Sequence, residues 1–145
     1  MDCIFCQIVE RRLPAEILFE NERVISILDI NPIHYGHALV IPKKHCLDFL
    51  SIPESDLHDV LHVTQIVARA IVTSLKLDGF NIFSNNGRVA GQSIFHFHMH
   101  VTPRYPDDNI KFVLQLKSYK DGKLAEYAST IREYIRQQPT TKENQ

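Results

Sequence analysis

The 145-residue chain has 44% hydrophobic and 23% charged residues, a composition that suits one folded domain with a hydrophobic core. Its 16 basic and 17 acidic residues give a formal net charge of -1, whereas proteins that bind nucleic-acid polymers normally carry a basic excess. The first residues, MDCIFCQIVERR, do not resemble a signal peptide, and no run approaches the ~20 apolar residues of a membrane span. We therefore expect a cytoplasmic domain over residues 1–138 with a mobile tail at 139–145, and neither a membrane nor a nucleic-acid partner.

The first part of the chain predicts a short helix followed by three strands. The helix ends near the sequence RRLPAE, because Pro14 disfavours a helical conformation in the residue before it. Asn21 and Glu22 separate two β-rich runs and indicate a hairpin. The predicted strands cover residues 16–20, 23–30 and 37–42.

The second part of the chain predicts a long helix, two strands and a C-terminal helix. Between residues 54 and 75, apolar side chains recur at helical spacing after Pro53, which the first turn of a helix tolerates. We expect strands at 80–84 and 93–102 and a second helix at 123–137. An antiparallel meander of about five strands, with the helices collected on one face, belongs to the α+β class.

The last predicted strand contains three histidines at every second position, His96, His98 and His100, separated by the apolar residues Phe97 and Met99. Successive side chains of a strand alternate between its two faces, so the three histidines would share one face. Neighbouring rings would lie ~6.6 Å apart along the strand. This pattern alone is compatible with a metal site, a catalytic row or ordinary packing.

The loop and strand NNGRVAGQSIFHFHMHVTPR resemble the histidine triad family of nucleotide hydrolases and transferases, whose signature is three histidines separated by single apolar residues. Four further matches precede this segment in the family's order: CIFC at 3–6, LDINP at 28–32, GHALVIPKKH at 36–45 and NIFSNNG at 81–87. The resemblance spans residues 3 to about 105. It implies an antiparallel sheet with a long helix, and a homodimer in which two such sheets join.

The resemblance implies covalent catalysis by His98. In this family the middle histidine attacks the α-phosphorus of a bound purine nucleotide, and water then discharges the nucleotidyl-histidine. A neutral imidazole suits this task, because its ordinary pKa of ~6.5 leaves much of it unprotonated near pH 7. His100 and His37 match histidines that assist around the phosphate and the leaving group. We therefore expect a nucleoside phosphoramidase or dinucleoside polyphosphate hydrolase whose chemistry requires no metal.

The same resemblance assigns the contacts with the nucleotide. Asp29 matches the acid that accepts hydrogen bonds from the ribose hydroxyls, a task suited to a carboxylate, which only accepts. Gln92 and Ser93 are expected donors to the phosphate, and Asn85 matches a polar position that contacts the phosphate or the ribose side. These four residues are therefore the expected substrate-binding set.

A structural zinc site is expected separately from the chemistry. Cys3 and Cys6 form a Cys-x-x-Cys pair, which is half of a common zinc site. In cysteine-bearing members of the family, a histidine after the sequence IPK and the first triad histidine complete the site, here His45 and His96. Two buried thiols beside a neutral histidine are the alternative. Cys46 is expected to be a core thiol.

Two other functions compete with the hydrolase. One is a nucleotide-binding or scaffold protein without catalysis, whose partner binding would survive His98→Ala. The other is a zinc-dependent hydrolase that uses the triad as its metal site. Three rings on successive outward positions of a strand span ~13 Å and cannot all reach one ion at ~2.1 Å unless the strand bends.

Overall fold

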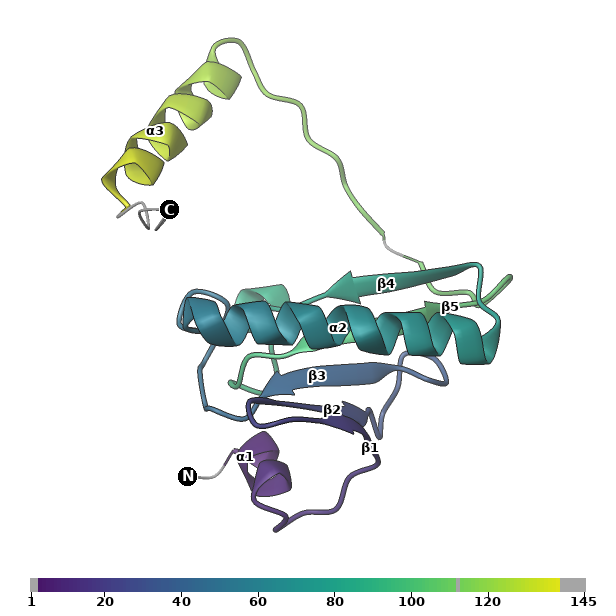
Figure 1. Cartoon of the computed structure of the whole chain (residues 1–145). Coiled ribbons are helices and arrows are strands. Elements are labelled where there is room, and N and C mark those ends of the chain that lie inside the picture. Colours follow the sequence, from purple (N-terminus) through teal and green to yellow (C-terminus); the bar gives the residue numbers. More distant parts are fainter. Residues whose placement is uncertain (1–2, 112, 139–145) are drawn as a thin grey trace, which may run out of the picture. The chain divides into compact units, whose positions relative to one another are not determined.

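A computed structural model describes residues 3–111 and 113–138 of the chain (Figure 1). The chain divides into two compact units, residues 1–109 and 110–145. The first unit contains the sheet and two of the helices, and the second contains the remaining helix. The expected tail at 139–145 lies outside the described residues, and the single domain over 1–138 stays a prediction.

The elements fall into three α-helices, one 3-10 turn and five strands. The helices are α1 (Ile4–Val9), α2 (Glu54–Leu75) and α3 (Lys123–Gln137), and the 3-10 turn is η1 (Arg88–Ala90). The strands are β1 (Ile17–Glu20), β2 (Val24–Leu28), β3 (Ala38–Pro42), β4 (Gly79–Phe83) and β5 (Met99–Arg104).

The strands form one antiparallel sheet in the order β1-β2-β3-β5-β4, which confirms the expected α+β fold. The order departs from a strict meander at one end, because β5 enters between β3 and β4. The register places His100 of β5 between Leu39 of β3 and Phe83 of β4. The insertion of β5 therefore brings His100 into the interior of the sheet and next to His37, which precedes β3.

The sheet is covered on both faces, so the expectation that the helices collect on one face is wrong: α2 lies on one face and α1 on the other. Along one face lies α2, as Figure 1 shows, and its buried side chains pack with Val24, Val40 and Val101 of the sheet. On the other face, Phe5 and Ile8 of α1 join a second core cluster, made with Ile25, Ile27, Leu39 and Ile41. Because β2 and β3 are buried on both faces, their sequences read as continuous apolar runs rather than as alternating ones.

The long helix α2 has the bounds that its apolar periodicity predicts. Pro53 precedes it, and Glu54 and Asp56 place negative charge in its first turn, where the helix dipole favours it. Its buried side chains recur three or four residues apart, from Val60 to Ile71. No helix in the described part of the chain is long and apolar enough to cross a membrane.

The predicted histidine strand is wrong over its first half. Residues 94–96 form a bend, and β5 begins only at Met99. The N–H of His96 donates to the carbonyl of Ile94 over 2.9 Å, and the N–H of Phe97 donates to the carbonyl of Cys46 over 2.7 Å. These backbone groups are committed to local and loop partners, so they cannot extend the ladder with β3.

The expected alternation of side chains nevertheless holds through this segment. Phe97 and Val101 are buried in the core cluster beneath α2. His98 and His100 face a cavity on the α1 side of the sheet. The side chains therefore alternate between the two faces even at residues 97 and 98, which precede the hydrogen-bonded strand.

The second unit contains α3, which also has its predicted bounds. Leu124, Tyr127, Ile131 and Ile135 recur at helical spacing and are all more than half exposed. The helix has an apolar stripe but buries none of its residues.

We predict that Ile71→Ala lowers the free energy of unfolding by ~2–5 kcal/mol, because it leaves a void between α2 and the sheet. Ile71 is 7% exposed. Urea denaturation would measure the change. Leu50→Ala is the control, since Leu50 is 91% exposed and its loss should cost less than about 0.5 kcal/mol. Equal costs for the two variants would contradict this description of the core.

Candidate functional site

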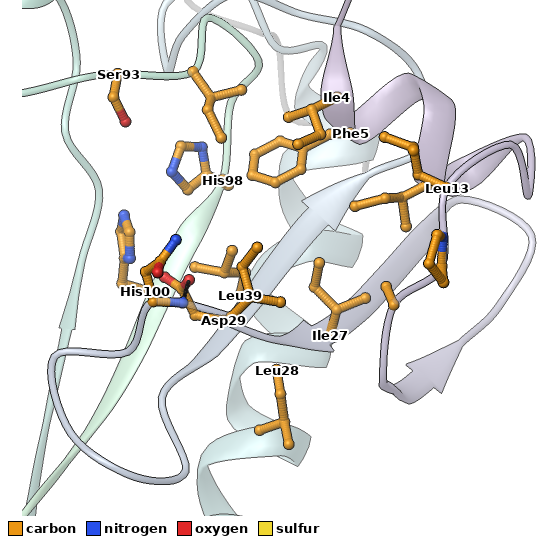
Figure 2. A pocket seen from close by; sticks show the side chains of 16 residues that line it. Ile4, Phe5, Leu13, Ile27, Leu28, Asp29, Leu39, Ser93, His98 and His100 are labelled. Carbon is orange, nitrogen blue, oxygen red and sulfur yellow. Dashed lines mark hydrogen bonds between the residues drawn. The ribbon is translucent and has the colours of Figure 1, made fainter.

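A cavity of about 500 Å³ lies between α1, the end of β2, and the starts of β3 and β5. One end is apolar and is lined by Ile4, Phe5, Ile8, Leu13, Pro14, Ala15, Ile27 and Leu39. The other end presents Asp29, Asn31, Ser93, His98 and His100. Figure 2 shows Ser93, His98, His100 and Asp29 together at one end and Leu13 and Ile27 at the other. Such a cavity suits a ligand with a flat apolar part and a polar part.

His98 is held in one tautomer by the backbone. Its Nδ1 donates to the carbonyl of His96 over 2.7 Å, so Nδ1 carries the ring proton and Nε2 is unprotonated. Burial lowers the pKa of His98, and the bond to the His96 carbonyl opposes this only in part. His98 is therefore a neutral imidazole with an available lone pair beside the cavity.

His37 and His100 form a hydrogen-bonded pair whose proton positions follow from the backbone. The N–H of Ile33 donates to Nδ1 of His37 over 3.2 Å, so the ring proton of His37 is on Nε2. Nε2 of His37 then donates to Nδ1 of His100 over 2.9 Å. His100 consequently carries its own proton on Nε2, which makes that nitrogen a donor.

The same pair is kept neutral by its surroundings. Burial lowers the pKa of His100 to about 4, with smaller contributions from His98 and His37. Burial also lowers the pKa of His37. The ring of Phe83 stacks on His100, with centroids 4.5 Å apart and an interplanar angle of 10°. His98 and His100 are themselves 4.7 Å apart between centroids, close enough to act on one group.

Asp29 lies at the end of β2 beside this pair. Its N–H donates to the carbonyl of His37 over 2.9 Å, and its Oδ1 accepts from the N–H of Asn31 over 2.9 Å. Oδ2 lies 3.5 Å from Nδ1 of His37, a separation that would suit a protonated Nδ1. The shorter bond from Ile33 excludes that assignment, since a backbone N–H can only donate. Oδ2 is therefore available to a ligand.

The three polar residues of the loop before the triad lie in different surroundings. Ser93 is exposed at the rim of the cavity. Gln92 is 4% exposed, and its amide is fully used: Oε1 accepts from Gly87, and Nε2 donates to the carbonyls of Leu47 and Ile94. Asn85 and Gln92 are not among the described residues that line the cavity. Gln92 therefore braces the loop that carries Ser93.

A second cluster lies behind the cavity and contains Cys3, Cys6, His45 and His96, the four expected metal ligands. The measured separations are 3.4 Å for Cys3 Sγ to His96 Nδ1, 3.4 Å for Cys6 Sγ to His45 Nδ1, 3.7 Å for Cys6 Sγ to His96 Nδ1, and 3.2 Å between the two Nδ1 atoms. Ligands about 2.0–2.3 Å from a tetrahedral zinc lie roughly 3.3–3.8 Å from one another. Four of the six donor–donor separations are therefore close to those of a tetrahedral site, and all four donors lie within 4.8 Å of one another.

The tautomer of His96 and the nature of the donor atoms also fit a divalent metal. Nε2 of His96 donates to the carbonyl of Pro42 over 2.8 Å, which leaves Nδ1 unprotonated and directed at the thiols. Burial, and after it the neighbouring Cys3 thiol, raises the pKa of Cys6. A cation among the donors would reverse this effect by stabilising thiolates. Cys3, Cys6, His45 and His96 could thus hold a metal ion.

The apolar wall of the cavity was missed by the sequence reasoning. The motif CIFC indicates two thiols and a family resemblance, but it does not by itself predict that Ile4, Phe5 and Ile8 form one face of a helix. The spacing of these three residues, which recur after one and four positions, is the signal that predicts a buried helical face.

Comparison with known proteins identifies the family. A model of the HIT domain matches residues 10–107, and the chain belongs to this family. An uncharacterized HIT-like protein of Methanocaldococcus jannaschii is 43% identical over 112 residues, which cover 76% of this chain and 86% of the relative. The adenylylsulfatase HINT3 of Arabidopsis thaliana is 34% identical over 137 residues, which cover 92% of this chain and 70% of the relative.

Solved structures of the family share the fold. A HIT family member from Bacillus subtilis has a TM-score of 0.86 at 35% identity and covers 92% of this chain and 96% of its own. A histidine triad nucleotide-binding protein from Candida albicans has a TM-score of 0.84 at 29% identity, covering 94% and 99%. A zinc-bound histidine triad family protein from Mycobacterium smegmatis has a TM-score of 0.73 at 38% identity, covering 93% and 98%.

We predict that the purified protein contains zinc in a one-to-one ratio and that Cys6→Ser strongly reduces this content. Elemental analysis after exhaustive dialysis would measure it. Cys46→Ser is the matched control, because Cys46 lies in the core beneath α2, where burial raises the pKa of its thiol to about 11. Loss of zinc from both variants alike would contradict the assignment of ligands.

We predict that stability falls as the pH is lowered from about 6.5 toward 4. The pKa of His100 is about 4 in the folded protein, whereas an unfolded histidine titrates near ~6.5. Between these values the unfolded state binds more protons, so acidification favours unfolding. Urea denaturation across this range should show a shallower dependence for His100→Gln. Parallel curves for the two proteins would show that His100 is not the buried neutral group described here.

Proposed function

We propose that this protein is a nucleotide hydrolase that cleaves at the α-phosphate of purine nucleotide conjugates, such as phosphoramidates and dinucleoside polyphosphates. The observation that carries the proposal is the neutral His98, whose Nδ1 is tied to the His96 carbonyl and whose Nε2 lone pair is available. Membership of the HIT family, with its nucleotide-binding and hydrolase fold, supports this assignment.

The substrate would lie along the cavity. The apolar end has the size and character to hold a base between α1 and the β2–β3 pair. The free Oδ2 of Asp29 would accept hydrogen bonds from ribose hydroxyls, and the α-phosphate would then lie between Ser93, His98 and His100. The name of one relative, adenylylsulfatase, is consistent with an adenylyl group at this position.

The reaction would proceed in two displacements. Nε2 of His98 attacks the α-phosphorus, the bond to the leaving group breaks, and the leaving group takes a proton from solvent while Nε2–H of His100 donates a hydrogen bond to it. Water then attacks the phosphorus, the phosphorus–nitrogen bond breaks, and the proton released by the water passes to solvent. The products are a nucleoside monophosphate and the free leaving group, and both histidines end in their initial state.

His37 would support this cycle without touching the phosphorus, since its Nε2–H holds Nδ1 of His100. Ser93 would donate to a non-bridging oxygen. Gln92 and the half-buried Asn85 would act through the shape of the loop, given that both N–H donors of the Gln92 amide already have partners. Such transfers depend on hydrogen-bond donors or positive groups placed around the phosphate, and in this cavity the groups would be neutral donors.

The remaining features of the proposal concern metal, assembly and compartment. Zinc held by Cys3, Cys6, His45 and His96 would be structural, because two thiolates and two imidazoles leave no position for water. A homodimer would form at the β4 edge, where Phe80 and Ile82 are 41% and 44% exposed and a groove of about 480 Å³ lies against α2. A cytoplasmic location would suit the free cysteines.

We predict that wild-type protein mixed with an adenosine phosphoramidate and quenched within one turnover carries an acid-labile adduct of nucleotidyl mass. Intact-mass spectrometry would detect the adduct. His98→Ala should form none and should lose roughly 10⁴-fold or more in turnover, because it lacks the nucleophile. His58→Ala is the matched control, since the His58 side chain is 83% exposed on α2.

Other outcomes would replace the proposal. Turnover without an adduct that stops at once on chelation would indicate a metal-dependent hydrolase. Nucleotide binding with neither adduct nor turnover, with both a phosphoramidate and a dinucleoside polyphosphate, would indicate a binding or scaffold protein.

A further inference from the structure

The short helix α1 belongs to two sites at once. Cys3 at its N-terminal boundary and Cys6 within it supply two of the four donors of the metal cluster. Between them, Ile4 and Phe5 line the cavity, and Ile8 follows on the same side. The helix that carries half of the metal ligands is therefore also a wall of the proposed nucleotide site.

Little else holds α1 in place. It has six residues, no side-chain cap and no acidic residue in its first turn. An isolated helix shorter than ~12 residues is marginal in water, so this one depends on its tertiary contacts. Its buried side chains are Phe5 and Ile8. The position of the wall therefore depends on Phe5 and Ile8, on the partly buried Val9 packed against the same cluster, and on the contacts of its two thiols.

The ring of Phe5 lies between a metal-cluster histidine and the cavity histidine. Its centroid is 5.8 Å from that of His96 at an interplanar angle of 77°, and 5.1 Å from that of His98 at 72°. Both are edge-to-face contacts, whose geometry depends on the orientation of each ring. A shift of α1 would therefore change the contact between the rings of Phe5 and His98.

A second connection runs through the backbone of His96. Its Nδ1 faces the thiols, while its carbonyl accepts the Nδ1 proton of His98 over 2.7 Å. A metal that fixes the imidazole of His96 would also restrict the carbonyl that orients His98. The two connections, through Phe5 and through His96, lead from the same cluster to the same ring.

We propose that metal binding at the four-donor cluster and nucleotide binding in the cavity are energetically coupled through α1, with Phe5 as the positioning residue that carries the coupling. The inference rests on the proposed function in that it takes a nucleotide as the ligand of the cavity. Coupling between two sites is reciprocal, so the metal should strengthen nucleotide binding by the factor by which the nucleotide strengthens metal binding.

The test uses AMP as the probe and the full chain under reducing conditions. Isothermal titration would give the dissociation constant of AMP for the zinc-loaded protein and for the protein stripped of zinc, at a temperature where circular dichroism shows both to be folded. We expect AMP to bind at least about fivefold more tightly to the zinc-loaded form, the lower end of typical coupling. Chelator competition for zinc, with and without AMP, should give the same factor.

Phe5→Leu separates the coupling from the stability of the fold. This variant keeps an apolar side chain but loses the ring edge, so zinc should change AMP affinity by less than in wild type. Phe49→Leu is the matched control, because Phe49 packs on Phe97 and is not among the described residues of the cavity. It should keep the full wild-type factor. A factor that is the same in both variants would overturn the role of Phe5.

The outcomes separate this inference from the proposed function. Equal AMP affinity of the folded zinc-loaded and zinc-free proteins overturns the coupling and leaves the proposed function intact. No binding of AMP to the zinc-loaded protein overturns both. If the zinc-free protein unfolds, cobalt-loaded protein replaces it: AMP should change the cobalt d–d absorption bands in wild type and less so in Phe5→Leu. Unchanged bands at saturating AMP would overturn the coupling.

Discussion

The arrangement of this site depends on how His96 is held. Its ring donates to the carbonyl of Pro42 and so directs Nδ1 at the two thiols, while its own carbonyl fixes the tautomer of His98. One residue thus orients a donor of the Cys3, Cys6, His45 and His96 cluster on one side and the proposed nucleophile on the other. The bend at residues 94–96 makes this possible, because it releases the backbone of His96 from the sheet.

Burial then decides the charge state of the remaining histidines. His37, His98 and His100 lie close together, and a charge on any one of them would be poorly solvated, which lowers the pKa of each ring. All three are therefore neutral. Because each bond donates from one ring to a carbonyl or to a free ring nitrogen, every proton has a defined position. The cavity is thus supplied with one lone pair and one donor without any ionised histidine.

Patterns that repeat over many residues predicted the structure best. The bounds of α2 and α3 follow from apolar periodicity over several turns, and the hairpin follows from two β-rich runs around a turn. The start of β5 did not follow, because Phe97 gives its N–H to Cys46, a partner from a distant segment. Gln92 illustrates the same limit for function. Its residue type indicates a donor to the substrate, but both amide N–H groups donate to backbone carbonyls of the protein, those of Leu47 and Ile94.

Local information in the chain was enough to place the three histidines on one face and the apolar residues between them on the other, since alternation is a property of the backbone itself. It could not assign these histidines by geometry to two different sites. Cys3, Cys6 and His45 reach His96, and His37 reaches His100, only because the sheet and α1 bring segments far apart in the chain into contact. The tertiary packing sets the spacing of the donors and the position of each proton along the hydrogen bonds. No short stretch of the sequence contains this information.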